Sequence, residues 1–337
     1  MRTRDGPDDG TVPGVRRTGV PGLTRPPRQE ESRVARRRVT LVAAALLWRA
    51  AGPGSRRNVV APAESLHVSV EGAGAPVVLV PGMLGSGFAY RKVVPLLVAE
   101  GYETVVIEPL GIGGSSRPEH ANYSLTAQSD RIAAVLDTLG LSHVIVVAHT
   151  LGASMVYRLA VHRPDLVGAV LSLDGGPAEA AATPGFRRAM AFAPWIKLFG
   201  GVRLIRGRIH KSLLAASGDT SWVTDRVVDG YVADAKADLD GTLKAYLGMA
   251  HAREPERLAP ELERIRCPVR LLMGGAPHHG GISSPEVDEL RQDLTSFTIE
   301  TVPHAGLFLQ EERPDVVAAA VTQLAGTVVG TRPGGSR

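Results

Sequence analysis

The stretch VVAHTLGAS, residues 146–154, decides how this chain is interpreted. A run of apolar residues leads into it, Thr150 stands at its centre, and the small residues Ala148 and Gly152 flank that threonine. This pattern predicts a buried strand that turns sharply into a helix. Such a turn holds its central residue in a strained backbone region, which β-branched residues tolerate poorly. Thr150 is therefore the first candidate for chemistry, and an unusual one.

Strands and helices alternate on both sides of this turn. Short continuous apolar runs predict buried strands, and apolar residues at helical spacing predict helices between them. The expected strands cover 75–82, 103–111, 143–150, 168–176, 267–275 and 296–303. The expected helices cover 88–102, 126–141, 151–164, 285–294 and 314–325. This order predicts an α/β fold with a mostly parallel, twisted sheet and helices on both of its faces.

The alternation stops after the strand that ends near Asp174, where only helices and loops are expected. A helical insertion at this point predicts a lid over the carboxyl ends of the strands, where sheets of this kind bind ligands. The chain then divides into a basic leader (1–57), a core in two parts (58–175 and 264–327), the lid (176–263) and a disordered tail (328–337).

The leader accounts for the basic charge of the chain. Residues 1–57 hold 13 arginines and 5 acidic residues, whereas residues 58–337 hold 25 basic and 29 acidic residues. The expected folded part is therefore mildly acidic, and nothing in it predicts nucleic-acid binding. The single cysteine, Cys267, excludes an intramolecular disulfide and is expected to pack as a small apolar residue.

The leader itself allows several interpretations. Residues 1–38 are rich in Arg, Pro and Gly, which predicts disorder. The apolar run at 39–48 has ten residues, whereas about 20 are needed to span a bilayer. Three arginines precede the run, as in a signal peptide, but Arg49 closes it and no small-residue cleavage site follows. A cytoplasmic protein with a short leader is expected; secretion, membrane tethering and a translation start near Val34 or Val39 are the alternatives.

Four segments, taken in order, resemble signature segments of the α/β-hydrolase superfamily. VVLVPGMLGSGFAYRKVVPLL (77–97) resembles its oxyanion loop with the flanking strand and helix, with Pro81 where histidine is usual. EPLGIGGSSRP (108–118) resembles its Asp-x-x-Gly-x-Gly-x-Ser segment, with Glu108 in place of Asp. VVAHTLGAS resembles its nucleophile elbow, and EERPDVVAAAV (311–321) its last helix. The resemblance runs from about residue 65 to 326 and implies an α/β-hydrolase fold.

The resemblance also implies three catalytic groups: a nucleophile on the elbow, a histidine and an acid. Thr150 takes the place of the usual serine. The histidine is expected five residues before Glu312, where this chain has Leu307. The loop 276–281, where the acid is expected, holds no Asp or Glu. An eroded catalytic triad is therefore implied.

Other groups of the chain could still act at such a site. His304, three residues before Leu307, is a candidate improvised base, with a structural histidine as the alternative. Asp174 occupies the family's alternative acid position, where structural aspartates are also common. The resemblance places the backbone N–H groups of Met83 and Leu151 in an oxyanion hole, which does not depend on side chains.

The remaining polar residues near these motifs are expected to be structural. His149 is expected to pack under the sheet, and Ser154 to be an ordinary helical residue. His278 and His279 could suggest a metal, but adjacent side chains diverge in extended chain and no Asp, Glu or Cys accompanies them. A solvated loop is favoured there, and neither a metal nor a cofactor is predicted.

The segment 185–211 holds seven Lys or Arg residues and no acid, interleaved with apolar side chains. Together with residues 33–57 it could contact an anionic membrane surface. The favoured alternative is a lid whose basic face is solvated and whose apolar face covers the pocket. In both cases the ligand is expected to be small and partly apolar.

The expected function is therefore that of an α/β-hydrolase-family protein of ester- or acyl-hydrolase ancestry. It would bind a small apolar carbonyl- or ester-like ligand and be weakly active or non-hydrolytic, because loss of a triad residue costs about 10⁴- to 10⁶-fold in kcat. One alternative is an active enzyme that uses the Thr150 hydroxyl in hydrolase, lyase, isomerase or cyclase chemistry. Another is a membrane-associated binding or scaffold protein.

Overall fold

The computed structural model describes residues 64–192, 195 and 200–330. The predicted leader at 1–57, with its apolar run at 39–48, lies outside the described residues, as do residues 331–337. Within the described residues, no helix combines the length and the apolar character that crossing a membrane requires.

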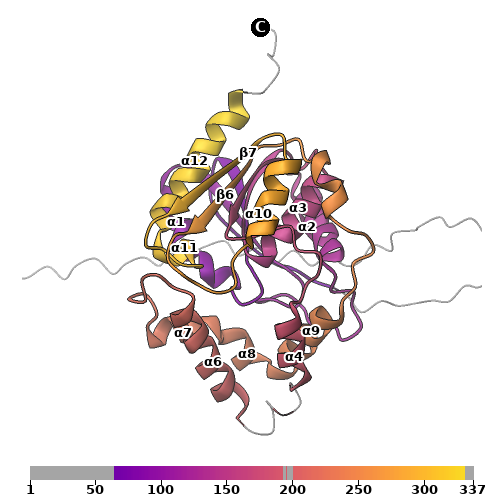
Figure 1. Cartoon of the computed structure of the whole chain (residues 1–337), viewed down its shortest axis with the longest axis vertical. Coiled ribbons are helices and arrows are strands. Elements are labelled where there is room, and N and C mark those ends of the chain that lie inside the picture. The colour runs from indigo at the N-terminus through magenta and orange to yellow at the C-terminus, as the bar shows by residue number, and fades with distance from the viewer. Residues whose placement is uncertain (1–63, 193–194, 196–199, 331–337) are drawn as a thin grey trace, which may run out of the picture. The chain divides into compact units, whose positions relative to one another are not determined.

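A seven-stranded sheet forms the centre of the fold (Figure 1). Its order is β1-β3-β2-β4-β5-β6-β7, and every pair is parallel except β1 and β3. The strands are β1 (His67–Gly72), β2 (Ala75–Val80), β3 (Tyr102–Glu108), β4 (Val144–His149), β5 (Val167–Leu173), β6 (Val269–Gly274) and β7 (Phe297–Val302). The predicted α/β class with a mostly parallel sheet is confirmed.

Strand β1 is absent from the sequence prediction. It is an edge strand that pairs only with β3, and just one of its residues, Val68, is buried. Sequence patterns detect strands by apolar runs or regular alternation, and this strand has only a weak form of either. This strand is defined by its antiparallel pairing with β3, which is a contact between segments distant in the sequence.

Helices cover both faces of the sheet because alternate residues of each strand point to opposite faces. On β4, Val144 and Val146 pack on one side with α2 (Leu125–Leu139) and α3 (Leu151–His162). On the same strand, Ile145 and Val147 pack on the other side with α1 (Val93–Ala99) and α12 (Pro314–Gly330). The first side also receives α10 (Ser284–Asp293) through Leu290.

Two predicted helices have different bounds in the structure. The expected helix at 88–102 is a short 3₁₀ helix, η1 (Gly87–Tyr90), followed by α1, which ends before Gly101. Gly101 has a positive φ of 86°, a conformation that glycine adopts without strain. The last helix runs to Gly330 and so extends into the predicted tail at 328–337.

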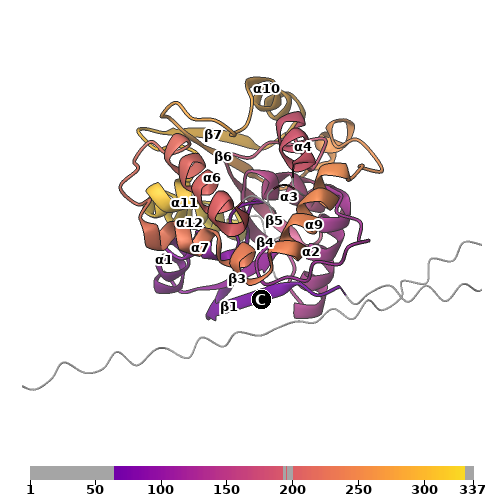
Figure 2. The ribbon, with the colours of Figure 1, turned by 90° about the horizontal axis from the view of Figure 1, so that it is seen from below.

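Between β5 and β6 the described residues form only helices, as the sequence predicts. We call this part, residues 176–263, the helical insertion. Its elements are α4 (Pro184–Ala191), α6 (Gly201–Ala215), α7 (Asp225–Tyr231), α8 (Ala233–Ala237), α9 (Leu239–His251) and the start of η2 (Ala259–Arg264). In Figure 1 these α helices gather below the sheet, and Figure 2 shows α4, α6 and α9 in front of the sheet, seen from that side.

Candidate functional site

The predicted strand–turn–helix at Thr150 is present. Thr150 lies between β4 and α3 with φ 45° and ψ −116°, and its N–H donates to the carbonyl oxygen of Leu173 at 3.0 Å. Positive φ is strained for a β-branched residue, and such strain is found where a fold fixes a functional side chain. A Cβ at Gly152 would lie 2.8 Å from the carbonyl oxygen of Val80. The small residue after the elbow therefore lets α3 start close to β2.

A cavity of about 660 Å³ opens above the elbow. Its walls combine the ends of β4 and β5, the loops after β2 and β7, and the helical insertion. Thr150 and Leu307 line it from the core, and Phe186, Ala215 and Ala216 line it from the insertion. Its lining is largely apolar, with a few polar side chains near the strand ends, an arrangement typical of small-molecule sites.

The two predicted oxyanion residues, Met83 and Leu151, both line this cavity. The hydroxyl of Tyr246 on α9 donates to the carbonyl oxygen of Met83 at 2.9 Å, which ties the Met83 loop to the insertion. A Cβ at Gly82 would lie 2.4 Å from Thr150 Oγ1. The threonine hydroxyl therefore faces the loop that carries Met83.

Glu108, which stands where the family usually has Asp, supports the same loop. Its carboxylate accepts the N–H groups of Gly87 at 2.5 Å and of Gly114 at 2.6 Å. It also lies 2.9 Å from Nδ1 of His67 on β1. One side chain thus joins the end of the oxyanion loop to the loop after β3. The carboxylate of Glu108 therefore has a structural role in this chain.

The position where the resemblance places a histidine holds a buried leucine side chain. Leu307 is 8% exposed, and its N–H donates to the carbonyl oxygen of Ala216 in the insertion at 2.8 Å. Glu312 shapes this loop by accepting the N–H groups of Gly306 at 3.0 Å and Gly218 at 2.9 Å. The loop geometry is therefore well defined, but its cavity-facing side chain cannot take a proton.

His149 lines the cavity and is almost completely buried. Its Nε2 lies 3.0 Å from the carbonyl oxygen of Leu307, so Nε2 carries the proton and donates it to that oxygen. Burial lowers the pKa of His149 to about 4, because the charged imidazolium is poorly solvated there. The ring is therefore neutral at pH 7. Its Nε2 is engaged in a structural hydrogen bond.

Asp174 lines the cavity with a carboxyl group that is 1% exposed. Its Oδ2 accepts the N–H of Gly274 at 2.7 Å and lies 3.4 Å from Nε2 of His278. Burial raises the pKa of this carboxyl, and the Gly274 N–H and His278 oppose the rise. Asp174 therefore has a histidine neighbour, His278, in the structure.

The prediction of a solvated loop at His278 and His279 is wrong for the first residue. The side chain of His278 is only 10% exposed, and its Nδ1 lies 2.8 Å from the carbonyl oxygen of Ala276. His279 is exposed and lines the cavity. No local pattern predicts that the loop 276–281 folds back onto the end of β5, because that contact joins His278 to Asp174, which is distant in the sequence.

His304, the candidate improvised base, is not among the residues that line the cavity. Its side chain is exposed, and its φ of 63° places it in the turn after β7. A Cβ at Gly218 would lie 2.1 Å from its carbonyl oxygen, so this turn packs closely against the helical insertion. The interpretation of His304 as a base is therefore corrected to a turn residue.

Glu286 lines the cavity but was not predicted as a site residue. Its side chain accepts the N–H of Ser283 at 2.9 Å and the Ser283 hydroxyl at 2.6 Å, while Ser283 caps α10. The sequence shows this pair as a helix-start signal, Ser-x-x-Glu. Only the placement of α10 beside Gly176 turns the capping glutamate toward the cavity wall.

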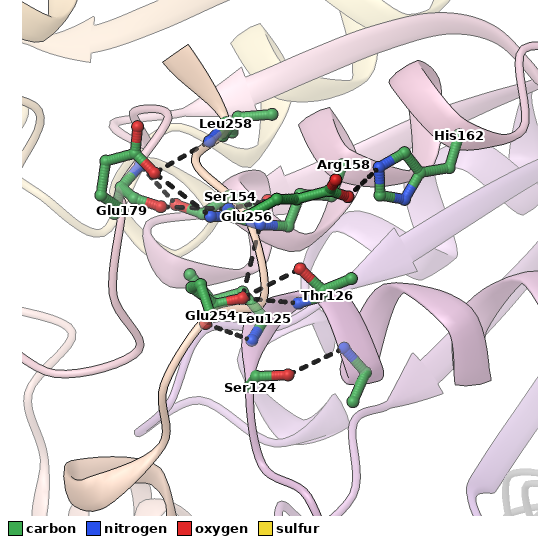
Figure 3. A network of polar contacts seen from close by, with 12 residues as sticks. Ser124, Leu125, Thr126, Ser154, Arg158, His162, Glu179, Glu254, Glu256 and Leu258 are labelled. Carbon is green, nitrogen blue, oxygen red and sulfur yellow. Dashed lines mark hydrogen bonds and ion pairs between the residues drawn. The ribbon is translucent and has the colours of Figure 1, made fainter. Parts of the chain in front are cut away.

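A buried arginine on α3 connects the helical insertion to the core (Figure 3). Arg158 is 2% exposed, and its Nη1 donates to the carbonyl oxygens of Ser154 at 3.2 Å and Ala178 at 3.0 Å. The hydroxyl of Ser154, predicted to be an ordinary helical residue, donates to the carbonyl oxygen of Gly176 at 2.6 Å. Both Ser154 and Gly176 line the cavity, so the network reaches its wall.

Comparison with known proteins gives the same fold. The family model for the alpha/beta hydrolase fold matches residues 75–194. The chain is 23% identical over 246 residues to an uncharacterised hydrolase of Bacillus subtilis, YugF, with 72% of this chain and 86% of that protein covered. It is 31% identical over 247 residues to an epoxide hydrolase of Caballeronia sordidicola, covering 72% of this chain and 65% of that protein.

A solved structure extends the likeness over most of the described residues. The thermophilic esterase from Thermogutta terrifontis superimposes with a TM-score of 0.66 at 18% identity, covering 87% of this chain and 99% of that one. At such identity the likeness concerns the fold alone. The family model, the relatives and the strand order agree with one another. The chain therefore belongs to the α/β-hydrolase superfamily.

Proposed function

We propose that the cavity binds a small, largely apolar carbonyl- or ester-like ligand and hydrolyses it slowly or not at all. The observation that carries the proposal is that Thr150 and Leu307 line the same cavity. Thr150, with its hydroxyl, and the two predicted oxyanion residues, Met83 and Leu151, line the same largely apolar cavity. At the position expected for the base, the side chain is a leucine.

The chemistry of the nearby groups supports slow turnover. A threonine hydroxyl attacks a carbonyl efficiently only when an adjacent base takes its proton. His149 is close by, but burial lowers its pKa to about 4, which makes it a weak base, and its Nε2 already carries the proton that it donates to the Leu307 carbonyl. An oxyanion hole without a base gives a residual acceleration of about 10³-fold over water. Binding of a carbonyl group at this point does not need the base.

Two measurements on the purified full chain test this function. Binding is followed with prodan, a fluorescent apolar ketone, and with methyl hexyl ketone as a non-fluorescent competitor. Hydrolysis is followed with p-nitrophenyl butyrate. Thr150→Ala removes the elbow hydroxyl, and Thr138→Ala, at an exposed position on α2, is the matched control.

We expect prodan to bind with competition by methyl hexyl ketone, and we expect hydrolysis rates of wild type and Thr150→Ala to agree within about tenfold. Ester turnover that is present in the wild type and in Thr138→Ala but lost in Thr150→Ala would show a threonine-dependent enzyme. Absence of prodan binding would remove the ligand-binding proposal itself.

A second candidate function, contact with a membrane surface, is supported by a separate observation. Phe192 is 62% exposed and Trp195 is 55% exposed, next to the exposed Arg187 and Arg188. Aromatic and basic side chains together suit the interface of an anionic membrane. Flotation with phosphatidylserine liposomes should then weaken in a Phe192→Ser/Trp195→Ser variant. Equal flotation of both proteins, or none of either, would argue against it.

A further inference from the structure

The guanidinium of Arg158 lies where both ends of the helical insertion meet the core (Figure 3). A buried charge is costly unless partners compensate it. Two carboxylates do so here: Glu179 Oε2 lies 3.7 Å from Nη2, and Glu254 Oε2 lies 3.6 Å from Nε. Glu179 belongs to the start of the insertion and Glu254 to its end. One arginine therefore holds together two segments that are far apart in the sequence.

Each carboxylate also accepts hydrogen bonds from backbone N–H groups. Glu179 accepts those of Leu258 at 2.9 Å and Ala259 at 3.0 Å, which joins the start of the insertion to its end. Glu254 accepts the N–H groups of Leu125 at 2.7 Å and Thr126 at 3.0 Å, in the first turn of α2. Glu179 thus connects the start of the insertion to its end, and Glu254 connects the end of the insertion to the core.

The arrangement also reaches the cavity. Arg158 donates to the carbonyl oxygen of Ala178, and the N–H of Ala178 donates to the hydroxyl of Ser154 at 3.1 Å. Ala178 and Ser154 both line the cavity. A displacement of the arginine would therefore move a wall of the cavity, although Arg158 itself is not part of the lining.

Without the arginine, two carboxylates would face each other across a partly buried space. Glu254 is 6% exposed and Glu179 is 36% exposed, so solvent would screen their repulsion incompletely. The two ends of the insertion would then repel each other at the point where they leave the core. Arg257 Nε also lies 3.6 Å from Glu179 Oε1, but among the ion pairs of the described residues Arg158 is the cation that contacts both carboxylates, so the arginine is needed for this geometry.

We propose that Arg158, Glu179 and Glu254 form a clasp that fixes both ends of the helical insertion, and that Arg158 is a positioning residue for the cavity. The clasp sets how often the insertion moves away from the core and therefore how fast a ligand enters and leaves. This second statement rests on the proposed ligand-binding function. The first, the local effect on the insertion, does not.

The test uses the full chain and three variants. Arg158→Met keeps the length of the side chain and removes the charge. Arg158→Lys keeps the charge and loses the planar guanidinium, whose Nη2 and Nε face the two carboxylates. Val321→Ala is the matched control, because it creates a small void in the core on the other face of the sheet, between α12 and the strands.

Hydrogen exchange and prodan kinetics are measured on all four proteins. In Arg158→Met we expect amide exchange at residues 177–183 and 252–259 to accelerate at least tenfold, and prodan dissociation to accelerate about fivefold or more. Arg158→Lys should retain most of the protection. In Val321→Ala, these two segments should not be selectively affected, even where its melting temperature falls as far as that of Arg158→Met.

Two outcomes would overturn the clasp. One is unchanged exchange at 177–183 and 252–259 in Arg158→Met. The other is acceleration that Val321→Ala reproduces in the same segments, which would make Arg158 an ordinary contributor to stability. If the exchange result is as expected but prodan binds none of the proteins, the ligand-binding function fails while the clasp stands. If prodan binds but its dissociation rate does not change, the clasp does not control ligand exchange.

Discussion

Nε2 of His149 lies 3.0 Å from the carbonyl oxygen of Leu307, and this hydrogen bond joins the residue before the elbow to the residue that replaces the expected base. The bond has two consequences. It holds the loop after β7 against the end of β4, so the loop keeps its shape without a catalytic histidine. It also engages Nε2 of an imidazole that lines the cavity.

The first prediction concerns recovery of hydrolysis. A nucleophile and its base act as a unit, so changes at the two positions should be strongly non-additive. We expect the double variant Thr150→Ser/Leu307→His to hydrolyse p-nitrophenyl butyrate on the order of 10²-fold faster than wild type. Each single variant should stay within about tenfold of wild type. If the double variant hydrolyses the ester no faster than the two single variants, a histidine at residue 307 does not bring its imidazole to the elbow.

The second prediction concerns pH. Burial lowers the pKa of His149 from its ordinary value of 6.5 to about 4 in the fold, so the unfolded chain binds the proton more tightly. Stability from this residue is therefore lost as pH falls from about 6.5 toward 4, by up to about 3 kcal/mol. His149→Gln, which can still donate to the Leu307 carbonyl, should reduce this loss in urea unfolding at each pH.

Its control is His120→Gln, at an exposed position. Other groups titrate in the same range, and buried carboxyls with raised pKa, such as Asp174, act in the opposite direction. The informative quantity is therefore the difference between each variant and wild type. A pH dependence in His149→Gln equal to that of wild type would show that this histidine is not buried in its neutral form.

The third prediction concerns the glycine that faces the elbow. A Cβ at Gly82 would lie 2.4 Å from Thr150 Oγ1 and 3.0 Å from the His149 carbonyl oxygen. Gly82→Ala should therefore cost about 1–3 kcal/mol in the free energy of unfolding and weaken prodan binding. Gly207→Ala on α6 meets no atom within 4 Å and should stabilise the protein by about 0.5–1 kcal/mol. Similar effects of the two substitutions would contradict the close approach at the elbow.

The fourth prediction concerns the contact between the insertion and the oxyanion loop. Tyr246→Phe removes the hydroxyl that donates to the Met83 carbonyl and should cost about 0.5–1.5 kcal/mol in the free energy of unfolding. Because Met83 lines the cavity, prodan affinity should also fall. Tyr102→Phe, on half-buried β3 surface, is the comparison. Unchanged prodan affinity in Tyr246→Phe would show that this hydrogen bond does not contribute to ligand binding.

Most of the strands and helices of the core could be predicted because the sequence patterns that indicate them are local. The apolar runs of β2, β4 and β5 and the helical spacing in α2 and α3 each lie within one short segment. The edge strand β1 was missed because only Val68 of its residues is buried. The bounds of η1 and α1 were wrong because a 3₁₀ turn and a helix share the same apolar spacing over a few residues.

At the site, the sequence alone determined which side chains are available: a threonine on the elbow, a leucine at residue 307 and no acid in the loop 276–281. Only the tertiary structure decided which of the others come together. It placed His278 beside Asp174, moved His304 away from the cavity, and brought Glu179 and Glu254 to Arg158. The contacts join residues 21 to 104 positions apart, whereas His304 and Leu307 are only three positions apart and just one of them lines the cavity. Both outcomes depend on how the loops and the insertion pack on the sheet. Local patterns carry no information about that packing.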